Sequence, residues 1–183
     1  MPTPSLLARI AANDRQAFAE LYRLCADRVY NTVLSYTRNA ADAEEVTQTV
    51  FVTIYRKAGQ FDGRSAPRTW IYRIAVNAAL NHLRKRRRDR LVTGETLPVE
   101  PIDFEHPGIL LEKREAAAAL FRLIGRLPEA QQTAFILSYV EELPRKEVAA
   151  IMETSLKAVE SLLHRAKQRL RAWITEDPNY RRN

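Results

Sequence analysis

Planar and cationic side chains are concentrated between Gln60 and Arg90, and together they can bind nucleic acid. Planar groups stack on bases, and Lys and Arg side chains bind phosphates. The stretch ends in a dense basic run, residues 84–88. The candidate contacts are Gln60, Phe61, Ser65, Trp70, Tyr72, Arg73, Asn77, Asn81, Arg84, Lys85 and Arg86. An exposed amphipathic helix with a basic end is the simpler alternative.

A loop followed by a helix is expected to position these side chains. Gly63 and Ser65 are typical of a loop, and Pro67 is typical of a first helical turn. From Thr69 onward, the apolar spacing predicts a helix that buries Ile71, Ile74, Ala75, Ala78 and His82. The same spacing places Arg68, Tyr72, Arg73, Asn77 and Asn81 on the opposite face, with Trp70 at its edge.

The sequence contains no pattern of an enzyme site. A glycine-rich nucleotide loop, a metal-binding carboxylate cluster and a nucleophile–base pair are all missing from it, so we expect no catalytic residue, metal, cofactor or small-molecule substrate. Cys25 is the single cysteine, which excludes an internal disulfide. No apolar run reaches membrane-spanning length, so we expect no membrane insertion and a cytoplasmic protein.

Charge divides the chain into three parts. Residues 1–90 carry 16 Lys and Arg against 8 Asp and Glu, and residues 113–183 carry 13 against 9. Residues 91–112 carry 5 acidic residues and no Lys or Arg, together with three prolines. Two basic blocks on an acidic connection indicate two polyanion-binding modules. The predicted fold class is all-α: two small helical domains, 1–90 and 113–183, joined by a flexible acidic linker, 91–112.

The N-terminal block has two further strong helix patterns. Asn13 or Asp14 is placed to cap a helix that extends to about Asn39. A second helix is predicted from Asp42 to Gly59, with acidic residues in its first turn and basic ones in its last. Its apolar stripe is Ala43, Val46, Val50 and Ile54. Its other side carries Glu45, Gln48, Thr49, Val52 and Tyr55, for which a solvated surface is the simplest interpretation.

The C-terminal block predicts a helix-turn-helix. A short helix over Arg145–Met152 is followed by a turn at Glu153–Thr154, and Ser155 is placed to cap a longer helix. The expected core positions of that helix are Leu156, Val159, Leu163, Ala166 and Leu170. The candidate DNA contacts are Lys157, Glu160, Ser161, His164, Arg165, Lys167 and Gln168. A helical hairpin with charged solvent-exposed faces is the alternative.

The segment FDGRSAPRTWIYRIAVNAALNHLRKRRR closely resembles the promoter-melting segment of bacterial RNA polymerase sigma factors of the extracytoplasmic-function (ECF) group. The segment LPEAQQTAFILSYVEELPRKEVAAIMETSLKAVESLLHRAKQRLR resembles the −35-recognition domain of the same group. The resemblance covers nearly the whole chain in the same order. It departs from the family at Pro144, which replaces a capping Ser or Thr, at Glu153, where Gly or Asp is common, and at Thr49, where many members have Glu.

The resemblance implies roles for the candidate residues. The loop and helix after Gln60 bind the unpaired −10 element, and the C-terminal helix-turn-helix binds the −35 element. The helix beginning near Asp42 docks on core RNA polymerase, through Asp42, Glu45, Gln48, Thr49 and Val52. The acidic linker lies in the active-site and RNA-exit path of the polymerase. The partners implied are core polymerase, promoter DNA and an anti-sigma factor.

Two rival functions remain open from the sequence. A conventional helix-turn-helix regulator would bind operator DNA as a dimer and would leave the basic run near Trp70 unexplained. A protein that mimics a sigma factor would sequester an anti-sigma factor without supporting transcription. We favour a dissociable specificity subunit without enzymatic activity.

Overall fold

The computed structural model describes residues 2–93 and 114–176, and its regular structure there is helical, as predicted. The described helices form two compact units, α1 to α4 and α5 to α8. Most of the predicted linker, residues 94–112, lies outside the described residues. The domain limits at 90 and 113 and the flexibility of the linker therefore stay predictions.

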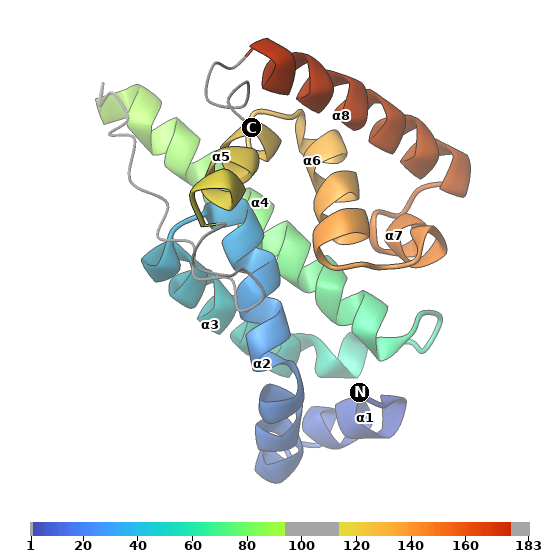
Figure 1. The fold of residues 1–183 in the computed structure, drawn as a ribbon. Helices are drawn as coiled ribbons and strands as arrows, with labels where there is room; N and C mark the ends of the chain where they lie inside the picture. Colours follow the sequence, from blue (N-terminus) through green and yellow to red (C-terminus); the bar gives the residue numbers. More distant parts are fainter. Residues whose placement is uncertain (1, 94–113, 177–183) are drawn as a thin grey trace. The chain divides into compact units, whose positions relative to one another are not determined.

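The first unit is built on three long helices that pack against one another (Figure 1). Its elements are α1 (Pro4–Ala11), α2 (Arg15–Thr37), α3 (Ala40–Lys57), the 3₁₀ turn η1 (Ala58–Gln60) and α4 (Pro67–Thr93). Its core includes Leu7, Leu21, Tyr36, Val50 and Ile54, whose side chains are almost fully buried. This burial supplies the main stabilisation of the unit, since removing apolar surface from water is the dominant favourable term in folding.

Short polar side chains cap the N-termini of these helices. The Asp14 carboxylate accepts hydrogen bonds from the backbone N–H groups of Gln16 and Ala17, at 2.9 and 3.1 Å. The Asn39 side chain accepts one from the N–H of Asp42 at 2.9 Å and so begins α3. Each cap binds an N–H group that has no partner within its helix. Of the two residues proposed to cap α2, Asn13 and Asp14, Asp14 is the one that does so.

Helix α4 buries a different face from the one expected. Its buried side chains are Thr69, Ile71, Tyr72, Ala75, Val76, Ala79 and Leu80, whereas Ile74, Ala78 and His82 are only partly buried. The buried stripe is therefore turned by about one residue, because Tyr72 and Val76 pack inward. The helix also continues to Thr93, three residues into the expected linker.

The second unit contains the predicted helix-turn-helix. Its elements are α5 (Arg114–Ile124), α6 (Glu129–Phe135), the π-helical turn η3 (Ile136–Val140), α7 (Arg145–Ile151) and α8 (Leu156–Glu176). Helices α6 and α7 both pack on α8 (Figure 1). Burial of Val159, Leu163, Ala166 and Leu170 confirms four of the five expected core positions of α8. Leu156 was placed wrongly, since it is 39% exposed in the first turn.

The turn between α7 and α8 forms without glycine. Glu153 adopts a left-handed backbone with a φ of 51°, and the N–H of Thr154 donates to the carbonyl of Ala149 at 2.9 Å. The Ser155 hydroxyl then accepts from the N–H of Ala158 at 3.1 Å, as its predicted capping role requires. Pro144 precedes α7 with a φ of −55° and makes no side-chain cap. Both departures from the family pattern are thus compatible with the motif.

Candidate nucleic-acid interface

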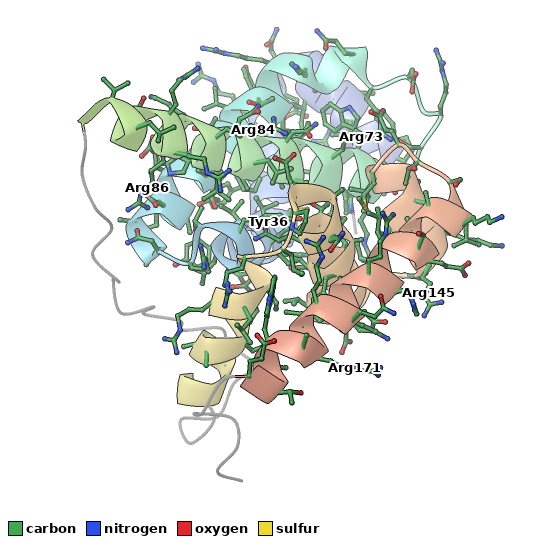
Figure 2. All side chains as sticks on the ribbon, turned by 90° about the horizontal axis from the view of Figure 1, so that it is seen from above. Tyr36, Arg73, Arg84, Arg86, Arg145 and Arg171 are labelled. Atoms are coloured by element: carbon green, nitrogen blue, oxygen red, sulfur yellow. The ribbon has the colours of Figure 1, made fainter. Side chains whose placement is uncertain are left out.

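One face of α4 carries a row of exposed or half-exposed polar and aromatic groups. Asn77, Asn81, Arg84 and Lys85 are exposed, and Trp70 is half-buried at the start of the row. The Arg84 guanidinium donates to the Asn81 side-chain oxygen at 3.1 Å. Arg73 is partly buried and belongs to the same row, and Figure 2 labels Arg73 and Arg84 along this helix. We call Trp70, Arg73, Asn77, Asn81, Arg84 and Lys85 the α4 row.

The loop before α4 leads into this row. Gln60 is exposed, and Phe61 and Ser65 are half-buried. The Phe61 ring meets the Trp70 ring edge-to-face, with 5.7 Å between centroids. Between them Gly63 has a φ of 73°, a conformation that suits glycine. The loop thus places an aromatic pair at the N-terminal end of the α4 row, where an unpaired base can stack.

The structure contradicts the prediction that Tyr72 contacts DNA. Its side chain is 4% exposed and points into the core of the first unit, with the Arg68 guanidinium 5.7 Å from its ring centroid. A buried ring cannot stack on a base. The sequence pattern misled because Tyr is tolerated both in cores and at polar surfaces.

Arg86, in the basic run, has a charged partner on another helix. Its guanidinium contacts the carboxylate of Asp42, in the first turn of α3. His82 lies against the same carboxylate, with 3.4 Å between Nε2 and Oδ1. Burial, and then the nearby Arg86 charge, lowers the pKa of Arg38, at the end of α2. One predicted DNA contact and one predicted polymerase contact therefore bind each other, across the α3–α4 packing.

The remaining candidates on α3 share one exposed face. Glu45, Gln48, Thr49 and Val52 are all exposed, and 49% of the apolar Val52 side chain is accessible. Tyr55 follows one turn later and is 38% exposed. We call Glu45, Gln48, Thr49, Val52 and Tyr55 the α3 face. Exposed apolar groups among polar ones are typical of protein-binding surfaces. Asp42 does not share this exposure, because only 19% of its side chain is accessible.

All seven candidate residues of the helix-turn-helix are exposed. Helical periodicity places Lys157, Ser161, His164 and Gln168 opposite the buried stripe of α8. Glu160 and Lys167 lie on one flank, and Arg165 lies on the other. The arrangement suits a helix that faces base edges in a major groove, with Lys167 at the rim near the backbone.

Arg145 was not among the residues selected from the sequence. It begins α7, and its guanidinium lies 3.7 Å from the Glu160 carboxylate of α8. Figure 2 labels it on the second unit. Its place in the first turn of the first helix of the motif could have identified it, since that helix crosses the DNA backbone in such motifs.

The described part of the chain has neither a metal-binding cluster nor a membrane-spanning helix. Its His, Cys, Asp and Glu side chains form no cluster of three or more that could bind a metal ion. Its helices include none that is long and apolar enough to cross a bilayer.

Comparison with known proteins links both units to one family. The sigma-70 region 2 family matches residues 21–89, and the sigma-70 region 4 family matches residues 117–170. The chain is 32% identical to the RNA polymerase sigma-H factor of Pseudomonas aeruginosa, over 89% of each chain. It is 33% identical to the ECF RNA polymerase sigma-E factor of Escherichia coli, again over 89% of each.

A solved structure agrees in fold. The sigma factor RpoE of Bartonella quintana, crystallised with the anti-sigma factor NepR, superposes with a TM-score of 0.69 at 21% identity. The match covers 87% of this chain and 98% of that one.

Proposed function

The chain belongs to the sigma-70 family of RNA polymerase sigma factors, in its ECF group, and from this premise we propose how its two units divide the recognition of a promoter. The first unit captures unpaired bases of the −10 element, and the second binds duplex DNA at the −35 element. The observation that carries this proposal is the contrast between the two surfaces. One is a helix face with an aromatic pair, and the other is a helix-turn-helix.

The second unit supplies duplex recognition. The outward positions of α8, from Lys157 to Gln168, are exposed. Helices α6 and α7 pack on the other side of α8. Carboxylate and guanidinium groups at Glu160 and Arg165 can bind cytosine N4 and the edge of guanine, respectively. Hydrogen bonds of this kind distinguish sequences, whereas the surrounding cations supply affinity.

The first unit supplies single-strand capture. A base that leaves the duplex can stack near the Phe61–Trp70 pair, while Asn77 and Asn81 lie farther along the same face. Arg84 and Lys85 then bind phosphates of the adjoining strand. Tyr72 has no direct part, because it is buried.

Base capture is too weak to open the promoter without a partner. Separating a duplex costs about 1.4 kcal/mol per base-pair step. Each base that stacks on a side chain returns about 1–3 kcal/mol. One or two captured bases therefore nucleate an opening, and propagation requires core polymerase. We assign polymerase binding to the α3 face.

An anti-sigma factor is a further expected partner. The Bartonella quintana structure contains a sigma factor bound to such a protein. The exposed apolar groups of the α3 face suit a protein partner of this kind as well as polymerase. A protein that covered this face would exclude polymerase, so regulation by competition follows directly.

Run-off transcription tests the proposed function. Purified chain and core polymerase are combined with fragments of the genome that encodes the chain, and transcripts are sequenced. We expect initiation from a subset of fragments that share −35 and −10 elements. Failure to bind core polymerase, together with no transcript from any fragment, would contradict the proposal. A dimeric chain that binds duplex tightly by itself would instead indicate a conventional regulator.

A further inference from the structure

Tyr139 lies beside the helix-turn-helix with cations from two helices around its ring and hydroxyl group. It is on the π-helical turn η3 and is 40% exposed. The Lys167 ammonium of α8 lies 4.6 Å from the centroid of its ring. The Phe135 ring, on the preceding turn, packs beside it with 4.9 Å between the ring centroids. Three elements of the second unit therefore meet at this tyrosine.

The π-helical turn accounts for the position of Tyr139. The N–H of Glu141 donates to the carbonyl of Ile136 at 3.0 Å, which is the five-residue spacing of a π-helix. The N–H of Leu143 then donates to the carbonyl of Leu137 at 3.0 Å and leads the chain toward α7. Such turns add a residue to a helix and are frequent at functional sites. Here the turn lets Ile136 and Leu137 stay buried while Tyr139 faces solvent.

The charges near the Tyr139 hydroxyl group are mainly positive. A hydrogen bond from Lys167 is the main cause that lowers the pKa of Tyr139, and Arg145 contributes in the same direction. Arg145 also approaches Glu160, at 3.7 Å, but both side chains are about half exposed. An ion pair of that geometry is weak and readily exchanged. Two cations therefore act on one hydroxyl group, and the Glu160 carboxylate beside Arg145 is loosely held.

We propose that Tyr139, Lys167 and Arg145 form a binding site for a backbone phosphate of duplex DNA. The inference rests on the proposed function and adds Tyr139 and Arg145, which lie outside α8, to the proposed DNA contacts. Lys167 and Arg145 supply charge, and the Tyr139 hydroxyl donates a directed hydrogen bond. Lys, Arg and Tyr side chains are all common phosphate ligands in DNA complexes.

The place of the site in the motif favours a phosphate over other anions. Lys167 lies on a flank of α8, next to the positions that face bases, and Arg145 is in the first turn of α7. The first helix of a helix-turn-helix crosses the DNA backbone while the second occupies the groove. A phosphate at the rim of the groove is therefore the anion nearest to both cations when α8 is bound. An acidic side chain of a protein partner is the competing occupant, and the test separates the two.

The experiment measures closed-complex binding of holoenzyme to duplex −35 DNA from a promoter found by run-off transcription. The duplexes form a series in which single phosphates are replaced by neutral methylphosphonates. The sigma variants are wild type, Tyr139→Phe and Lys167→Ala, with Arg122→Ala as the matched control because Arg122 is an exposed arginine on α5. Circular dichroism and melting curves verify that each variant is folded.

We expect Tyr139→Phe to weaken duplex binding by up to about tenfold, because a hydrogen bond to a charged group is lost. The slope of log affinity against log salt should stay unchanged for this variant. That slope is negative, and Lys167→Ala should reduce its magnitude by about 0.9, the value for one phosphate contact. At one methylphosphonate position wild type should lose more affinity than Tyr139→Phe does, because the variant has only the Lys167 and Arg145 contacts to lose there. Arg122→Ala should behave as wild type does.

Three results would overturn the inference. One is a folded Tyr139→Phe variant that binds every duplex as tightly as wild type does. Another is weakened binding in which Tyr139→Phe keeps the full wild-type sensitivity to every methylphosphonate. The third is weaker association with core polymerase at unchanged DNA affinity, which would assign the site to an acidic protein partner. If wild-type holoenzyme binds no duplex at all, the proposed function itself fails.

Discussion

The carboxylate of Asp42, in the first turn of α3, binds the guanidinium of Arg86 on α4. The two residues are 44 positions apart in sequence, and 19% and 30% of their side chains are accessible. The contact joins the helix that carries the α3 face to the helix that carries the α4 row. It indicates that Asp42 and Arg86 help to fix the relative position of the two helices.

Asp42→Asn should therefore destabilise the first unit without abolishing its function. Exposed ion pairs contribute up to about 1 kcal/mol, and breaking a buried pair costs about 3–5 kcal/mol. For this half-buried pair we expect a loss of about 1–3 kcal/mol in the free energy of unfolding. Trp70 and Trp173 are the two tryptophans of the chain, one in each unit, so a Trp173→Phe background lets Trp70 fluorescence report on the first unit. The additional change Arg86→Gln should cost little more, and fully additive losses would contradict direct pairing.

Neighbouring aromatic residues on α4 should behave differently in strand opening. Trp70→Ala combined with Asn77→Ala should slow opening, measured by permanganate reactivity of unpaired thymines, and leave association with polymerase intact. Tyr72→Phe is the matched control because the Tyr72 ring is buried and keeps its packing. Loss of opening in Tyr72→Phe, or equal loss of polymerase binding in the double variant, would show that the site is misplaced.

A substitution on the α3 face should reduce the affinity of the chain for core polymerase selectively. Val52→Glu introduces a charge among exposed apolar groups and should weaken binding to core polymerase at least about tenfold, as for a central interface residue. Leu24→Glu on α2 is the control, because Leu24 is apolar and 48% exposed, close to the 49% of Val52. Competition binding with labelled wild-type chain gives both affinities. Equal effects of the two variants would argue against a localised interface.

The left-handed backbone at Glu153 predicts a stabilising substitution. That conformation costs a residue with a side chain about 1–2 kcal/mol of conformational energy, whereas glycine adopts it without this cost. The entropy that glycine adds to the unfolded chain offsets part of this gain. Glu153→Gly should therefore raise the free energy of unfolding of the second unit by about 0.5–1 kcal/mol. Trp173 fluorescence in a Trp70→Phe background measures it. Glu142, which also has a positive φ, of 52°, offers an independent second position.

Local signals in the sequence predicted much of this fold. Asp14 and Ser155 cap helices as their types and positions indicated, and Gly63 adopts the positive φ that a loop glycine allows. These features depend on a few neighbouring residues, so the sequence alone contains the information. The family resemblance then supplied the roles of the two units, which periodicity does not reveal.

Features that depend on tertiary packing were predicted less well. The buried face of α4 differs by about one residue because Tyr72 packs against neighbouring helices, and a tyrosine alone does not indicate which side it takes. In the sequence Arg86 is one of several basic residues in a run, and only the packing of α3 on α4 reveals its contact with Asp42. Leu156 is apolar yet exposed in the first turn of α8. Tyr139 was missed because the π-helical turn that carries it leaves no signature in hydrophobic spacing.

Binding of holoenzyme to two forms of one promoter tests the division of labour most directly. One form is fully duplex, and the other has the −10 strand unpaired beside an intact −35 duplex. We predict that Trp70→Ala with Asn77→Ala weakens binding to the unpaired form while duplex binding at −35 stays at the wild-type level. Arg165→Ala should weaken both forms by the same factor, because both keep the −35 duplex. If the double variant also weakens both forms by the same factor, the two units do not divide promoter recognition as proposed.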